Sequence, residues 1–214
     1  PNSQALWNLA RFDQEMAETD RDTLVDFYHR MLQKHLYVHG PDKTLLSKNA
    51  AFSTWTQAIA QQYPDARFLL CVRDPVRALS SQLSAIHDAR EAFATDPLGK
   101  IFPKRFHRLY AEAFQHLHQA AVLHPDRMKV IDMSELQTQP GASIRKALLA
   151  MDLPISPALN QALGAADEAA DQYESTHQHR IDDFNIDRAA VRADMTADYK
   201  ALRSADAHRL REVS

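Results

Sequence analysis

Two side chains with phosphate-binding chemistry lie where a predicted strand meets a predicted helix. Residues 68–72 form an apolar run that is typical of a strand buried on both faces. Arg73 follows it directly, and Asp74 with Pro75 predicts a helix start, because aspartate is a favoured N-cap and proline fits the first helical position. Arginine offers a fork of donors that matches phosphate oxygens, and Ser81 lies about one and a half turns into the helix. The junction therefore predicts an anion site, as found at the carboxyl ends of strands in α/β sheets.

Lys48 is the second candidate, at the end of the short apolar segment 44–48. A strand there would bring the lysine to the same sheet edge as Arg73, where it could stabilise charge on a leaving-group oxygen. The alternative interpretations are structural. Arg73 would form a salt bridge with a neighbour, Ser81 would simply be a small residue, and Lys48 would be an ordinary surface lysine. Spacing alone leaves both interpretations open.

Three short apolar segments predict the strands that position these side chains: residues 44–48, 68–72 and 128–132. A helix over about residues 53–62 connects the first two strands, which in one sheet implies a parallel pair with a right-handed crossover. Further helices are predicted over about residues 20–37, 75–87, 104–123, 143–151 and 187–210. Residues 164–180 are poor in apolar side chains and predict a mobile connector. The pattern indicates an α/β fold with a parallel sheet flanked by many helices.

The composition is that of an ordinary globular domain, with 45% hydrophobic and 25% charged residues. The net charge of −3 argues against general nucleic-acid binding but is compatible with a local basic pocket. Cys71 is the single cysteine, so no intrachain disulfide can form, and we predict a reducing, cytoplasmic location. No apolar run is long enough to span a membrane. The four glycines are isolated, so a glycine-rich phosphate loop, if the protein uses one, is expected before Pro1.

The eleven histidines do not predict a metal site. His116 and His118 lie two positions apart on a predicted helix and point to different faces, and His177 and His179 have the same spacing in the predicted connector. His177 and Arg180 are instead candidates to close over a bound anion, with an ordinary polar loop as the alternative. We therefore expect no metal cofactor.

With these residues assembled, the chain resembles the sulfotransferases that use 3′-phosphoadenosine-5′-phosphosulfate (PAPS), and most of all the bacterial-type family. The most specific motif is Pro64-Asp65-Ala66-Arg67-Phe68, followed by Val72-Arg73-Asp74-Pro75 and then Ser81. Weaker matches lie at residues 45–49, 130–136 with Pro140, and 175–177 with 181–184. The resemblance runs from about Asp22 to Tyr199 and implies a helix-rich fold similar to that of the P-loop NTPases.

The resemblance also implies roles for the candidate residues. It implies that Arg73 and Ser81 bind the 3′-phosphate of the cofactor. It also implies that Lys48 stabilises the charge that develops around the transferred group. Relatives carry a proline or a catalytic histidine two positions after this lysine, where the chain has Ala50, and a tyrosine where it has Met133. These departures leave the general base without a candidate.

We expect transfer of a sulfuryl group from PAPS to a hydroxyl or amine of a small-molecule, glycan or lipid acceptor. Such an in-line displacement depends mainly on positioning and charge stabilisation. The resemblance implies one sulfotransferase-like domain over residues 1–214 without the family's 5′-phosphosulfate loop. We therefore expect a fragment truncated at its N-terminus, with a degenerate member of the family as the alternative. Two alternatives stay open. One is a P-loop-type small-molecule kinase with Asp132 as its candidate magnesium ligand, and the other is a catalytically inactive sulfotransferase-like binding protein.

Overall fold

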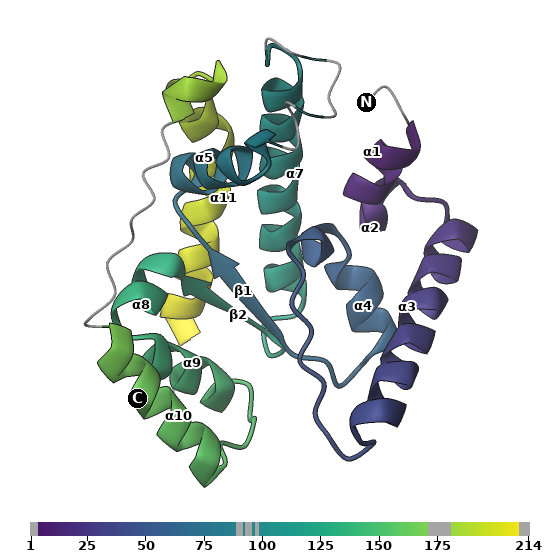
Figure 1. The fold of residues 1–214 in the computed structure, drawn as a ribbon, viewed down its shortest axis with the longest axis vertical. Coiled ribbons are helices and arrows are strands. Elements are labelled where there is room, and N and C mark those ends of the chain that lie inside the picture. Colours follow the sequence, from purple (N-terminus) through teal and green to yellow (C-terminus); the bar gives the residue numbers. More distant parts are fainter. Residues whose placement is uncertain (1–3, 89–91, 93–95, 97–98, 171–180, 210–214) are drawn as a thin grey trace. The chain divides into compact units, whose positions relative to one another are not determined.

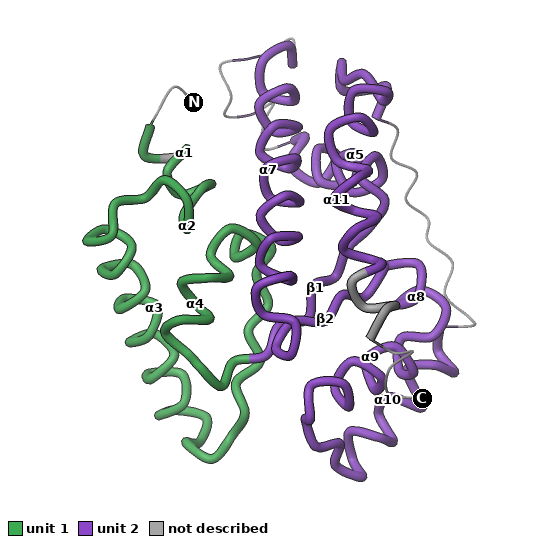
Figure 2. The backbone as a smooth tube through the Cα atoms, turned by 180° about the vertical axis from the view of Figure 1, so that it is seen from behind, with its two compact units in different colours: residues 1–66 green, residues 67–214 purple. Residues whose placement is uncertain are grey.

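A computed structural model describes residues 4–88, 92, 96, 99–170 and 181–209 (Figure 1). Contacts along the backbone divide the chain into two compact units, residues 1–66 and 67–214, which Figure 2 shows in different colours. Each unit has its own buried apolar cluster and is described by itself. That the two work as one sulfotransferase-like domain stays a prediction.

Unit 1 is helical, with elements α1 (Gln4–Ala10), α2 (Phe12–Glu15), α3 (Glu18–His39), the 3-10 helix η1 (Ala50–Thr54) and α4 (Thr56–Gln62). Its centre is the stacked pair of Phe12 and Trp55, whose ring centroids lie 3.6 Å apart. The Asp13 carboxylate accepts hydrogen bonds from the backbone N–H groups of Gln57 at 2.8 Å and Ala58 at 3.0 Å. Asp13 thereby caps the free N–H groups of α4 from a distant point in the sequence.

The strand predicted over residues 44–48 is not formed. The segment pairs with no strand in the described chain, and Leu46 is 92% exposed. Side chains hold it instead: the Tyr28 hydroxyl donates to Ser47 Oγ at 2.9 Å, and Asn49 caps η1. The prediction was wrong because an apolar segment becomes a strand only beside a partner, and residues 68–72 take a different partner.

Unit 2 contains a two-stranded parallel sheet of β1 (Phe68–Val72) and β2 (Met128–Asp132), which confirms two of the three predicted strands (Figure 1). The register pairs Val72 with Asp132, so both strands end at one sheet edge. Helix α5 (Pro75–Ala85) follows β1 and α8 (Met133–Thr138) follows β2. Two helices therefore begin at the same edge.

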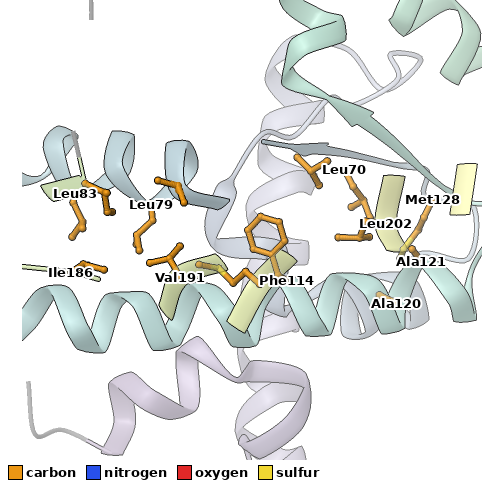
Figure 3. Packing of buried hydrophobic residues seen from close by; sticks show 14 residues of the cluster. Leu70, Leu79, Leu83, Phe114, Ala120, Ala121, Met128, Ile186, Val191 and Leu202 are labelled. Atoms are coloured by element: carbon orange, nitrogen blue, oxygen red, sulfur yellow. The ribbon is translucent and has the colours of Figure 1, made fainter. Parts of the chain in front are cut away.

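The other elements of unit 2 are α7 (Phe102–Leu123), α9 (Pro140–Leu149), α10 (Pro157–Ala170), the 3-10 helix η2 (Ile181–Phe184) and α11 (Arg188–Arg209). Figure 3 shows the core on one face of the sheet, where Leu70 and Met128 of the strands join Phe114 of α7 and Leu202 of α11. Alternate strand residues point away from this core, and Cys71 on that opposite side is exposed. The prediction that β1 is buried on both faces was wrong, because apolar side chains alone do not show which layers cover a strand.

Residues 164–170, predicted as part of a mobile connector, form the last turns of α10. The Asp167 carboxylate accepts hydrogen bonds from the N–H groups of Gly141 at 2.6 Å and Ala142 at 3.2 Å. It thus caps the start of α9 and ties the two helices together. Alanine is a strong helix former, so a segment poor in large apolar residues can still be helical. Residues 171–180 lie outside the described residues.

None of the described helices is long and apolar enough to cross a membrane.

Candidate functional site

The candidate site lies in unit 2, at the edge where β1 and β2 end. Asp74 accepts a hydrogen bond from the Arg77 backbone N–H at 3.0 Å, and Pro75 occupies the first turn of α5. These contacts confirm the N-cap predicted from the sequence. The helix therefore begins directly after the strand and points the positive end of its dipole at the sheet edge.

Arg73 and Ser81 both have donors that no group among the described residues uses. Within the described part of the chain, the half-buried Arg73 side chain makes no hydrogen bond or ion pair. The salt bridge that was the alternative interpretation of this arginine is therefore not found among the described residues. The partly buried Ser81 hydroxyl also has no partner among the described residues. Ser81 follows Asp74 by close to two helical turns and so lies on the same side of α5 as the N-cap.

The neighbouring serine behaves differently. Ser80 is 1% exposed, and its buried Oγ has no partner among the described residues. It shares the buried stripe of α5 with Val76, Leu79 and Leu83, which pack into the core (Figure 3). Ser80 and Ser81 are therefore adjacent in sequence, but Ser80 faces the core and Ser81 does not.

A buried carboxylate anchors the end of β2. Asp132 Oδ1 accepts hydrogen bonds from the Ser134 backbone N–H at 2.8 Å and from the Ser134 hydroxyl at 2.6 Å, which caps α8. Asp132 Oδ2 accepts a hydrogen bond from the Tyr199 hydroxyl at 2.5 Å and lies 3.2 Å from Arg203 Nε. Both oxygens are thus engaged by groups of the protein itself. This arrangement gives Asp132 a structural role in place of the magnesium ligation considered for a kinase.

The ionisation of this cluster follows from its contacts. Burial alone would raise the pKa of Asp132, but the hydrogen bonds from Ser134 and Tyr199 and the charge of Arg203 outweigh burial and hold that pKa below its usual range. Burial, the hydrogen bond to Asp132 and the charge of Asp132 raise the pKa of Tyr199 to about 12, against the opposing effect of Arg203. At neutral pH a neutral phenol therefore donates to a charged carboxylate.

Asp74, at the end of β1, acts electrostatically on Tyr199, which contacts the end of β2. Its negative charge adds to the rise in the pKa of Tyr199, so the carboxylate that caps α5 lies within electrostatic range of that phenol. The Arg203 guanidinium lies over the Tyr199 ring, 5.6 Å from its centroid. The edge thus gathers Arg73 and Arg203 with two aspartates and one tyrosine.

Asp132→Asn should destabilise the protein by about 2 kcal/mol or more at pH 7, because hydrogen bonds to a charged group are lost and Arg203 loses its partner. The pKa of Asp132 is lowered by folding, so its contribution is present above about pH 4 and disappears as the pH falls through the folded-state pKa. Urea unfolding of both proteins at pH 7 and pH 3 should show a difference that shrinks in acid. Equal stabilities at pH 7 would contradict this role.

The remaining predicted site residues lie elsewhere. Lys48 is exposed and belongs to unit 1, whereas Arg73 and Ser81 belong to unit 2. Lys48 follows Ser47, which Tyr28 holds. His177 and Arg180 lie outside the described residues, and their roles stay predictions.

Sequence reasoning missed Tyr199 and Arg203 as site residues, although one signal was available. The run from Asp132 to Glu135 has an aspartate at the N-cap and a glutamate three positions later, which is the pattern of a capping box. That pattern indicates the role of Asp132. Nothing in the local sequence of α11 indicates which strand its tyrosine and arginine contact.

The comparisons with known proteins identify the class. The model of the sulfotransferase family matches residues 3–157, more than half of the chain, and the chain therefore belongs to the sulfotransferase family. Family membership supports sulfuryl transfer and implies a P-loop-like fold, with which the helices and parallel strands agree. The family predicted from the Arg-Asp-Pro motif is thus confirmed. No curated protein and no solved structure matches the chain.

Proposed function

We propose that this sulfotransferase takes its sulfuryl group from PAPS and that Arg73 and Ser81 hold the 3′-phosphate of that donor. The observation that carries the proposal is the half-buried Arg73 guanidinium, which has no partner in the described chain and lies beside the start of α5. A half-buried arginine without a carboxylate partner among the described residues favours an anionic ligand, and a helix N-terminus adds positive potential. The Ser81 hydroxyl, which has no partner among the described residues, supplies a further donor.

The acceptor in this proposal is a hydroxyl or amine of a small molecule, a glycan or a lipid. Its oxygen or nitrogen forms a bond to sulfur as the bond between sulfur and the bridging oxygen breaks, and the electron pair of that bond passes to the departing 5′-phosphate. The acceptor proton leaves to a base that has no assignment in this chain. Lys48 stabilises the negative charge that develops around the transferred group.

Calorimetric titration with 3′-phosphoadenosine-5′-phosphate (PAP), the product that keeps the 3′-phosphate, tests this proposal. Ser81→Ala should weaken PAP binding about tenfold, since it removes a hydrogen bond to a charged group. Ser80→Ala is the matched control because its hydroxyl is buried without a partner in the described chain. It should leave the affinity unchanged and the melting temperature equal or higher. Failure of the wild type to bind PAP, or equal losses in both variants, would refute the assignment.

A further inference from the structure

Helix α11 brings a second arginine to the sheet edge that carries Arg73. The helix packs against α5, α7 and β2 within unit 2 (Figure 1). Tyr199 and Arg203 are four residues apart and so lie on one face of it, where both contact Asp132. All of α11 lies outside residues 3–157, so the family match assigns no role to these side chains.

The geometry of Arg203 leaves most of its donors available. Arg203 Nε lies 3.2 Å from Asp132 Oδ2, and the Nη groups make no hydrogen bond within the described residues. A guanidinium has five N–H donors, so the single contact leaves the four Nη donors of the fork unused. The side chain is 49% exposed, which lets a ligand reach it. An arginine that served only as the partner of Asp132 would be expected to use the fork against the carboxylate.

The surroundings of Arg203 also fix its position. Asp132 is buried and is held by Ser134 and Tyr199, so it cannot follow a moving arginine. The Tyr199 ring lies under the guanidinium and is itself packed edge-to-face against Phe114, with centroids 6.4 Å apart. A guanidinium held in this way loses little conformational entropy when a ligand binds.

We propose that Arg203 is a ligand-binding residue that donates to an anionic group of the phosphate-bearing nucleotide held by Arg73. Asp132 and Tyr199 are the positioning residues that aim it. The proposal rests on the proposed function, because it takes the same nucleotide as the ligand. In this proposal the anion is bound by Arg73, by the first turn of α5 and by a second guanidinium, that of Arg203. The helix that carries Arg203 lies beyond the residues of the family match.

The test is PAP titration at a series of salt concentrations with the wild type, Arg203→Gln, Arg203→Lys and Arg192→Gln. Arg203→Gln should weaken binding about tenfold to a hundredfold at low salt, as expected for hydrogen bonds to a charged group. The salt dependence of its affinity should also decrease, because one charge no longer contacts the ligand. Arg203→Lys should recover part of the loss. Arg192, exposed on the same helix, is the matched control and should behave as the wild type.

Tyr199→Phe separates positioning from direct contact. It removes the hydrogen bond to Asp132 but keeps the charge of Arg203, so it should weaken PAP binding severalfold while the salt dependence stays as in the wild type. A purely structural role for Arg203 would lower the melting temperature of Arg203→Gln without changing the salt dependence. If Arg203→Gln does not fold, Arg203→Lys decides, and wild-type affinity in that variant would overturn the inference.

The outcomes also distinguish this inference from the proposed function. If the wild type does not bind PAP, the proposed function and this inference fall together. If Arg73→Ala weakens binding while Arg203→Gln binds as tightly as the wild type with the same salt dependence, only the role of Arg203 is overturned. Loss of affinity and reduced salt dependence in Arg203→Gln would support both.

Discussion

Replacing Arg73 with alanine is expected to weaken PAP binding about a hundredfold, because a charged fork of donors is removed from a partly desolvated site. Since Arg73 has no partner in the described chain, the substitution leaves no protein charge unpaired, and the melting temperature should change little. Calorimetric titration and thermal unfolding of the same preparations measure the two effects. A large loss of affinity with unchanged stability would support a direct ligand contact.

Two further substitutions refine this result. Arg73→Lys keeps the charge but loses the planar fork, so it should recover only part of the affinity. Lys48→Ala should keep wild-type PAP affinity but slow the formation of PAP from PAPS with a pool of hydroxyl and amine acceptors, because its proposed role is in the transfer step. Wild-type affinity in Arg73→Ala would refute the 3′-phosphate assignment, whatever the stability of the variant.

Gly141→Ala is expected to destabilise unit 2 by about 3 kcal/mol or more. A Cβ atom on Gly141 would lie 1.9 Å from the Leu163 carbonyl oxygen and 2.6 Å from its carbonyl carbon. Both are backbone atoms of α10, so no side-chain movement can relieve the overlap, and α9 and α10 must separate. The Asp167 hydrogen bonds to the start of α9 would be lost with the packing.

The matched control is Gly164→Ala in α10. A Cβ atom there has no neighbour within 4 Å, and alanine is favoured over glycine inside a helix by about 0.5–1 kcal/mol. Urea unfolding should therefore show a loss of stability for Gly141→Ala and a small gain for Gly164→Ala. Wild-type stability in Gly141→Ala would show that the two helices are not packed as described.

The strand-to-helix junction could be read from the sequence because its determinants are local. Five apolar residues, an arginine, an N-cap aspartate and a proline predict β1 and the start of α5, with Arg73 and Asp74 between them, without reference to the rest of the chain. The same local information predicts β2 and the family. Hydrogen bonds, capping and periodicity act over a few residues; the structure confirms the two strands and the helix start, and the family match confirms the family.

The pairing of strands could not be read in this way. The sequence predicted residues 44–48 as the neighbour of β1, but β1 pairs with β2, whose residues come sixty positions later, and residues 44–48 form no strand. The local sequence of an apolar segment does not specify which other segment it pairs with. The pairing partner depends on which surfaces remain to be buried once the helices pack. The exposure of Cys71 likewise depends on which elements cover the two faces of β1, and the local sequence does not specify this.

The tertiary structure also decided how the candidate site is completed. The sequence by itself predicted Arg73 and Ser81 as candidates, one just before α5 and the other within it. Only the packing of α11 on β2 brings Tyr199 and Arg203 to Asp132. Tyr199 follows Asp132 by 67 positions and Arg203 follows it by 71, so no local sequence pattern can predict these contacts. The local sequence thus determined the strand-to-helix junction and its candidate residues, and the packing of helix on sheet determined which distant side chains contact Asp132.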